Sequence, residues 1–231
     1  MNYKVLIFDL DDTILDFKAG EKKGLKAVFD TFQKSALDYD AWVSAYKKIN
    51  ADIWQQIELG KPAQPLLNER FSKTFAQFDQ EIDGAQAEAT YRQVLDVNDA
   101  VMLGAKDLLD GVKQEGYQLV VGTNGKTNTQ YNRLALTGFD AYFDEVVISQ
   151  EIGHVKPSSS FFAHIFKLYP KYDKANFLMI GDTLTSDIQG ANQAGIDSVW
   201  LDHGTQHDRL SQEHKPTYRV KDLAQIKALL A

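Results

Sequence analysis

A short apolar run near the start of the chain ends in three carboxylates and a hydroxyl. The run Val5–Phe8 is followed by Asp9, Asp11, Asp12 and Thr13. An apolar run of this length is typical of a fully buried strand, so we expect these acids at the carboxyl end of a strand. Carboxylates that lie close together repel one another unless a cation or positive side chains neutralise them. The cluster therefore predicts a metal site.

Three later polar segments lie at or shortly after the ends of other apolar runs. In chain order they are Thr123-Asn124-Gly125, then Lys156, then the stretch 181–187, which contains Asp182 and Asp187. In a doubly wound sheet the carboxyl ends of the strands are neighbours, and ligands bind in the crevice beside them. We therefore expect residues from all four segments to meet in one site.

Apolar runs and helical patterns alternate along most of the chain. The expected strands are 5–8, 119–121, 146–148, 177–180, 198–201 and 218–220. The expected helices between or after them are 100–114, 128–136, 159–168, 187–194 and 223–230. Strands that alternate with helices of this length indicate a parallel sheet with crossover connections. The predicted fold class is α/β, with a doubly wound, Rossmann-like parallel sheet as its core.

One long stretch breaks this alternation, because it has helical periodicity and no convincing strand. Four segments in it can each place apolar or aromatic residues on one face, at 19–32, 41–58, 66–78 and 84–94. We interpret the stretch as an all-helical cap inserted after the first strand. The expected domains are a core formed by residues 1–16 and 99–231 and a cap formed by residues 17–98.

The composition of the 231 residues, 44% hydrophobic and 25% charged, is that of an ordinary globular protein. The net charge is −7 without a Lys/Arg-rich run, which argues against nucleic acid as a partner and against a polybasic membrane anchor. The absence of cysteine excludes disulfides, thiolate zinc sites and a cysteine nucleophile. The sequence has no signal-peptide pattern and no stretch of transmembrane length, so we expect a cytoplasmic protein. It leaves the choice between monomer and dimer open.

The four ordered segments resemble the motifs of the haloacid dehalogenase-like (HAD) hydrolase superfamily, and the resemblance covers nearly the whole chain. Three stretches are similar to one branch, the bacterial pyrimidine 5′-nucleotidases, namely 9–17, 123–134 and 181–195. The resemblance implies a Mg²⁺-dependent phosphomonoesterase that works through an aspartyl-phosphate. Its substrate would be a small phosphorylated metabolite, a nucleoside 5′-monophosphate with a pyrimidine base. A carboxylate suits this chemistry, because it is already ionised at neutral pH and needs no base to activate it.

The resemblance also implies a role for each segment. Asp9 would be the nucleophile, and Asp11 would be the general acid that later activates the hydrolytic water. Mg²⁺ would bind Asp9, Asp182 and the backbone carbonyl of Asp11. Asp187 would ligate the metal directly or hold a metal-bound water. Lys156 would place its charge between the nucleophile and the phosphate.

Other residues would hold the phosphate and the rest of the substrate. Thr123 and the backbone N–H groups around Asn124 and Gly125 would cradle the phosphoryl oxygens, because a helix is expected to begin there. The cap would close over the substrate and present the specificity surface. Phe17 could stack on a base, and Arg70 could reach a polar ring edge.

Three alternatives stay open. A sugar phosphate phosphatase or phosphomutase of the same superfamily has the same two aspartates and a similar cap. A phosphonatase would use a cap lysine, and the candidates are Lys22, Lys23 and Lys26. The loop Gly122–Thr127 resembles the ATP-phosphate loop of the Mur ligases, although Val120 stands where a Walker A motif has its first glycine. A ligase would leave Asp9 and Lys156 without a role.

Overall fold

The structure, a computed structural model, describes residues 2–204 and 214–230. The chain divides into two compact units, which we call the core domain (Met1–Asp16 and Asp99–Ala231) and the cap (Phe17–Asn98). In the described ranges no helix is both long enough and apolar enough to span a bilayer.

The core domain is built on a parallel sheet, which has six strands within the described residues, in the order β3-β2-β1-β4-β5-β6. The strands are β1 (Val5–Phe8), β2 (Gln118–Thr123), β3 (Glu145–Ile148), β4 (Phe177–Gly181), β5 (Asp197–Leu201) and β6 (Tyr218–Val220). The chain moves outward from β1 in one direction to β3, and then crosses to β4 on the other side of β1. In open α/β sheets, ligands bind at such a reversal, which here lies at the carboxyl ends of β1 and β4. The predicted doubly wound α/β class is confirmed.

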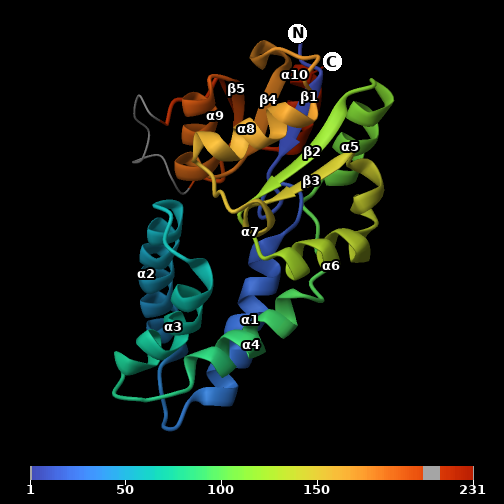
Figure 1. Cartoon of the computed structure of the whole chain (residues 1–231). Coiled ribbons are helices and arrows are strands. Elements are labelled where there is room, and N and C mark those ends of the chain that lie inside the picture. Colours follow the sequence, from blue (N-terminus) through green and yellow to red (C-terminus); the bar gives the residue numbers. More distant parts are fainter. Residues whose placement is uncertain (1, 205–213, 231) are drawn as a thin grey trace. The chain divides into compact units, whose positions relative to one another are not determined.

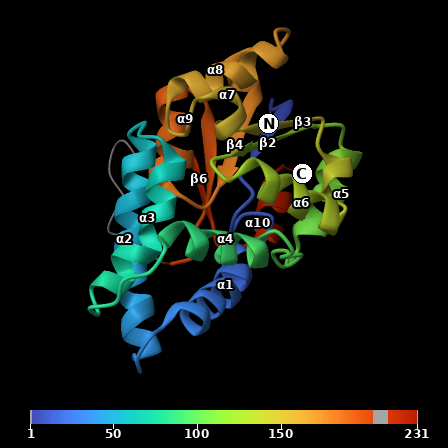
Figure 2. The same ribbon diagram turned by 60° about the horizontal axis from the view of Figure 1, so that its bottom comes forward.

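Helices cover both faces of this sheet, as Figures 1 and 2 show. One face packs against α5 (Ala105–Gln114), α6 (Thr127–Thr137) and α10 (Leu223–Leu230), and the other against α8 (Ser159–Leu168) and α9 (Gln189–Ala194). Shorter helical segments connect the main elements: η1 (Phe139–Tyr142), α7 (Ser149–Ile152), η2 (Lys174–Asn176) and η3 (Leu184–Ile188).

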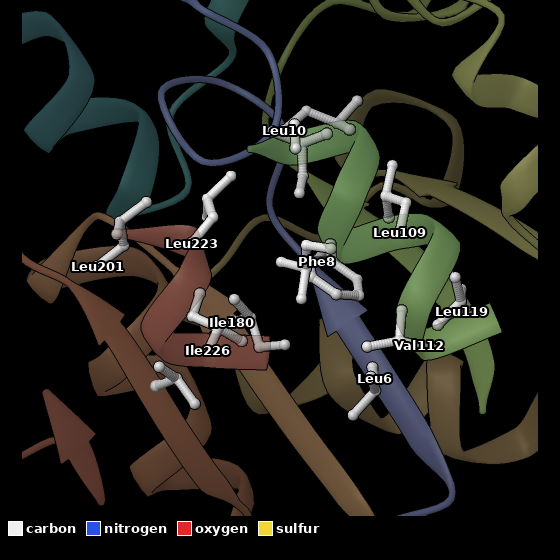
Figure 3. Close-up of a cluster of buried hydrophobic side chains, with 14 of the residues drawn as sticks. Leu6, Phe8, Leu10, Leu109, Val112, Leu119, Ile180, Leu201, Leu223 and Ile226 are labelled. Carbon is white, nitrogen blue, oxygen red and sulfur yellow. The ribbon is translucent and has the colours of Figure 1, made fainter. Parts of the chain in front are cut away.

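Strand β1 is apolar at every position because both of its faces are buried. Leu6 and Phe8 pack into the cluster formed with α5 and α10 (Figure 3). Val5 and Ile7 pack into the cluster on the opposite face. Successive side chains of a strand point to opposite faces, so an uninterrupted apolar run fits a central strand covered on both sides.

All regular secondary structure of the cap is helical. The helices are α1 (Phe17–Phe32), α2 (Tyr39–Glu58), α3 (Ala63–Ala76) and α4 (Gly84–Leu95). Asp38 caps α2 by accepting from the N–H of Ala41, and Asp83 caps α4 in the same way. The helices enclose an aromatic core, in which Trp42 stacks on Tyr46 and Phe71. Such offset aromatic pairs add to the free energy gained from apolar burial.

Arg70 lies inside this aromatic core, where its side chain is 1% exposed. Its Nε donates to the carboxylate of Glu88 at 2.8 Å, and its guanidinium lies 4.5 Å from the centre of the Tyr91 ring. The sequence suggested a substrate contact for Arg70; the structure instead gives it a packing role, because Glu88 already neutralises its charge. Phe17, the other expected cap contact, is half-buried against the same cluster.

Candidate active site

The structure brings the four sequence segments together at one edge of the sheet. Asp9 directly follows β1, Thr123 ends β2, and Asp182 directly follows β4. Lys156 reaches the same place from the segment after β3 and α7, and Asp187 from η3. All five side chains are buried, so the sheet edge holds a dense group of charges with little access to water.

Lys156 is the positive centre of this group. Its Nζ lies 2.7 Å from Asp9 Oδ1, 2.7 Å from Asp187 Oδ1 and 2.5 Å from the carbonyl oxygen of Gly122. Three donors of an ammonium thus meet three acceptors, which leaves the charge fully satisfied. Burial disfavours the ammonium, but Asp187 and Asp9 outweigh it and raise the pKa of Lys156. The lysine is therefore a fixed positive charge beside the expected nucleophile.

Asp9, Asp182 and Asp187 each offer a carboxylate oxygen, and these oxygens lie within 4.8 Å of one another. Burial and the charge of Asp187 raise the pKa of Asp9 to about 7, although Lys156 acts in the opposite direction. Burial, followed by the charge of Asp9, also raises the pKa of Asp182 well above its usual value. One ammonium cannot balance three buried carboxylates, so this donor set fits a divalent cation that prefers oxygen ligands.

Both oxygens of Asp187 already have donors. Oδ1 accepts from Lys156, and Oδ2 accepts from the N–H of Thr183 at 3.0 Å. The carboxylate packs tightly under Gly181, where an added Cβ would come within 2.3 Å of Oδ2. These contacts fit a residue that positions the lysine and the loop after β4 better than a direct metal ligand.

Thr123 has its hydroxyl oriented by two donors. The N–H of Gly125 donates to Thr123 Oγ1 at 3.0 Å, and Gln130 Nε2 donates to it at 2.9 Å. Both lone pairs of the oxygen are thereby used, so the hydroxyl hydrogen is left to donate. The N–H of Gly125, which the sequence suggested as a phosphate ligand, serves here to orient this hydroxyl.

Asn124 has a role that the sequence did not indicate. Its side-chain amide donates to the carbonyl oxygen of Lys156 at 2.9 Å and accepts from the N–H of Lys156 at 2.9 Å. This reciprocal pair fixes the backbone of the lysine to the loop after β2. The expectation that Asn124 contributes to phosphate binding concerns its backbone, and it stays a prediction.

The expected acid/base also has partners that the sequence did not reveal. Asp11 accepts hydrogen bonds from Gln130 and from Arg133, both on α6. Its neighbour Asp12 adopts φ 58°, as suits a turn residue, and its carbonyl oxygen lies 2.7 Å from Nε2 of His203. These contacts join residues more than a hundred positions apart in the sequence, so no local sequence pattern predicts them.

The site combines an aspartate at a strand end, a buried lysine and a pair of acidic residues on one doubly wound sheet. This combination is that of α/β hydrolases in which a carboxylate at the sheet edge acts as the nucleophile. The chain belongs to the haloacid dehalogenase-like hydrolase family, whose profile matches residues 3–195. The family resemblance predicted from the sequence is confirmed. The match includes the loop Gly122–Thr127 and so gives no support to the ligase alternative.

Two relatives and one solved structure are similar over nearly their whole length. The chain is 39% identical over 221 residues to the pyrimidine 5′-nucleotidase PynA of Streptococcus pneumoniae, and the matched region covers 95% of this chain and 92% of that protein. It is 28% identical over 235 residues to the pyrimidine 5′-nucleotidase YjjG of Escherichia coli, with 100% and 99% covered. The structure of the HAD-hydrolase YfnB from Bacillus subtilis bound to magnesium superposes with a TM-score of 0.90 at 34% identity, with 100% and 99% covered.

Proposed function

We propose that this chain is a Mg²⁺-dependent phosphatase that hydrolyses nucleoside 5′-monophosphates, with a preference for pyrimidine bases. One observation carries the chemical part. Lys156 Nζ lies 2.7 Å from both Asp9 and Asp187, beside a third buried carboxylate, Asp182. The substrate part is supported by PynA and YjjG, both of which are pyrimidine 5′-nucleotidases.

In the first step Asp9 attacks phosphorus with a carboxylate oxygen and the bond to the ester oxygen breaks. The leaving alkoxide takes a proton from Asp11, because an alkoxide is a poor leaving group without one. Lys156 holds the attacking carboxylate and reduces its repulsion from the phosphate dianion. The hydroxyl group of Thr123 donates its hydrogen to a phosphoryl oxygen. The products are the free nucleoside and a phosphoryl group bound to Asp9.

In the second step water attacks the same phosphorus. Asp11, now ionised, takes a proton from this water as the bond to the Asp9 oxygen breaks. Inorganic phosphate leaves, and the carboxylate of Asp9 and the proton on Asp11 are restored. The two steps therefore balance as the hydrolysis of one phosphoric monoester.

Asp9, Asp182 and the backbone carbonyl of Asp11 would hold Mg²⁺, with Asp187 orienting the loop around it. The bound cation supplies positive charge that neutralises the clustered carboxylates and the phosphoryl oxygens. The excess of buried negative charge at this edge of the sheet is the feature of the structure that supports a cation here.

Phosphate release by the purified protein with Mg²⁺ tests the proposal. The panel holds pyrimidine and purine nucleoside 5′-monophosphates together with hexose phosphates, and Asp9→Asn is the control because it keeps the shape of the side chain and removes the nucleophile. We expect the highest kcat/KM on the pyrimidine nucleotides, loss of activity with a chelator, and none in Asp9→Asn. Turnover of hexose phosphates with inert nucleotides would refute the substrate part. Activity that persists in Asp9→Asn would refute the mechanism.

A further inference from the structure

Two buried side chains of α6 hold the carboxylate of Asp11. Arg133, which is 0% exposed, forms an ion pair with Oδ1 through Nη1. Gln130, which is 1% exposed, donates from Nε2 to Oδ2 at 2.9 Å. Residues three apart lie on the same face of a helix, so one short segment of α6 supplies both donors. Asp11 itself keeps 30% of its side chain exposed, which leaves part of the carboxyl group accessible.

The two donors fix the rotation of the carboxyl group. Each donor contacts a different oxygen, so turning the group about its last bond would break both hydrogen bonds. Gln130 must present its NH₂ group here, because its carbonyl oxygen would repel a carboxylate. The second hydrogen of that NH₂ group goes to Thr123 Oγ1 at 2.9 Å. Gln130 thus ties the orientation of Asp11 to that of the hydroxyl expected to meet the phosphate.

The loop after β2 is shaped to admit this glutamine. A Cβ added at Gly125 would lie 2.0 Å from Gln130 Nε2, so any larger residue would displace the amide. Only glycine fits at position 125, because the side chain of Gln130 lies against its backbone on the way to Asp11.

Burying an arginine on a helix of the core domain is costly unless a specific contact requires it. A guanidinium loses several kcal/mol of hydration when it is buried, and an apolar residue of similar size would pack α6 without that loss. The neighbouring Leu134 shows that the hydrophobic contact of α6 with the sheet is made by other residues. The ion pair with Asp11 offsets part of this loss.

We propose that Gln130 and Arg133 are positioning residues that aim the carboxyl group of Asp11 during proton transfer. This inference rests on the proposed function, in which Asp11 protonates the leaving oxygen and later deprotonates water. The two hydrogen bonds occupy one position on each oxygen and leave the others for the proton that Asp11 donates or accepts. The proposed mechanism assigns neither residue a contact with the substrate.

Two substrates with different leaving groups separate this role from a merely structural one. Release of a nucleoside from its 5′-monophosphate needs a proton, whereas p-nitrophenolate leaves p-nitrophenyl phosphate without one. Single-turnover rates with Mg²⁺ report the first step for each substrate. The variants are Arg133→Met, Arg133→Lys and Gln130→Leu. The control is Arg219→Gln, which breaks an arginine–aspartate pair with Asp202 after β5 and leaves both hydrogen bonds to Asp11 intact.

We expect Arg133→Met to lower the nucleotide rate about 10²-fold and the p-nitrophenyl phosphate rate by a much smaller factor, with KM unchanged. Arg133→Lys should recover part of the nucleotide rate, and Gln130→Leu should reduce the same ratio of rates. Arg219→Gln should leave the ratio unchanged. Calorimetric titration should give the same Mg²⁺ affinity in all variants, because the expected ligand on Asp11 is its backbone carbonyl.

Equal losses on both substrates, or no loss, would overturn the inference. If Arg133→Met fails to fold, Arg133→Lys and Gln130→Leu decide the question by the same ratio. Failure of the proposed function gives a different result, because the wild-type protein would then release no nucleoside from the 5′-monophosphate.

Discussion

Replacing Lys156 by methionine tests the electrostatic core of the site, because it removes one charge and keeps most of the side-chain volume. The Nζ group is 2.7 Å from two carboxylates and 2.5 Å from a backbone carbonyl, so the variant loses three hydrogen bonds at once. Asp9 and Asp187 would stay buried, with no ammonium between them.

The contacts of Lys156 allow the size of two effects to be estimated, one on stability and one on kcat. Removing one partner of a buried ion pair costs about 3–5 kcal/mol, because the remaining charge stays buried. We expect the free energy of unfolding of the metal-free Lys156→Met protein to fall by about that amount. Removing one preorganised donor from an active site typically lowers kcat by about 10²–10³. Because Lys156 also lowers the pKa of Asp9, its loss leaves less of the nucleophile ionised at neutral pH.

Urea denaturation followed by tryptophan fluorescence measures the first effect, with and without Mg²⁺. Phosphate release measures the second. Mg²⁺ should restore part of the lost stability, because the cation supplies positive charge to the same carboxylates. The control is Lys126→Met, which removes a lysine that precedes α6 and has no role in the proposed mechanism. Normal activity in Lys156→Met together with lost activity in Lys126→Met would refute the assignment and favour a phosphate-binding role for the loop 122–127.

Three further results are expected. The folded state binds a proton on Asp9 more tightly than the unfolded state, because its pKa is raised from 3.8 to about 7. The stability that this proton contributes is complete below about pH 4 and is lost as the pH rises to about 7. Urea denaturation in the presence of a chelator should therefore show that the free energy of unfolding falls more steeply with pH in the wild-type protein than in Asp9→Asn across this window. Equal slopes in the two proteins would contradict this. Mg²⁺ should raise the melting temperature of the wild-type protein in a thermal scan and leave that of Asp182→Asn nearly unchanged; an equal rise in both would remove Asp182 from the metal site. Arg70→Met should lower the free energy of unfolding by about 3 kcal/mol, because Glu88 loses a buried partner, and Arg70→Met/Glu88→Gln should recover part of that loss. An Arg70→Met protein with unchanged stability and a raised KM would return Arg70 to substrate binding.

The five strands from β1 to β5 were predictable because each contains an apolar run of strand length. β1 has the same bounds as expected, and β4 is longer by one residue. Helix boundaries were less accurate. The pattern predicted a helix from residue 100, but α5 begins at Ala105, because Val101 pairs with Leu15 and Gly104 adopts φ 84°. A backbone contact between Val101 and Leu15, 86 residues earlier, cannot be predicted from local periodicity.

The chemistry-bearing residues of the site were predictable, whereas most of the residues that orient them were not. Asp9 stands out because three carboxylates follow a buried apolar run, and Lys156 becomes a candidate only through its place in the order of the four segments. Gln130 and Arg133 do not stand out, because polar residues on a helix normally face water. Their burial depends on Asp11, more than a hundred residues away in the sequence. The burial of Arg70 and its ion pair with Glu88 were likewise not predictable, because they depend on how the cap helices pack.

The reciprocal hydrogen bonds between Asn124 and the backbone of Lys156 have a consequence for how this site can vary. The amide imitates one rung of a β-ladder, so the lysine is held in register with the sheet although no strand continues to it. The position of Lys156 therefore depends on this pair as well as on the intervening segment, which includes α7. Substitutions of the exposed residues Gln150, Glu151 and His154 are therefore expected to leave the charge beside the nucleophile in place.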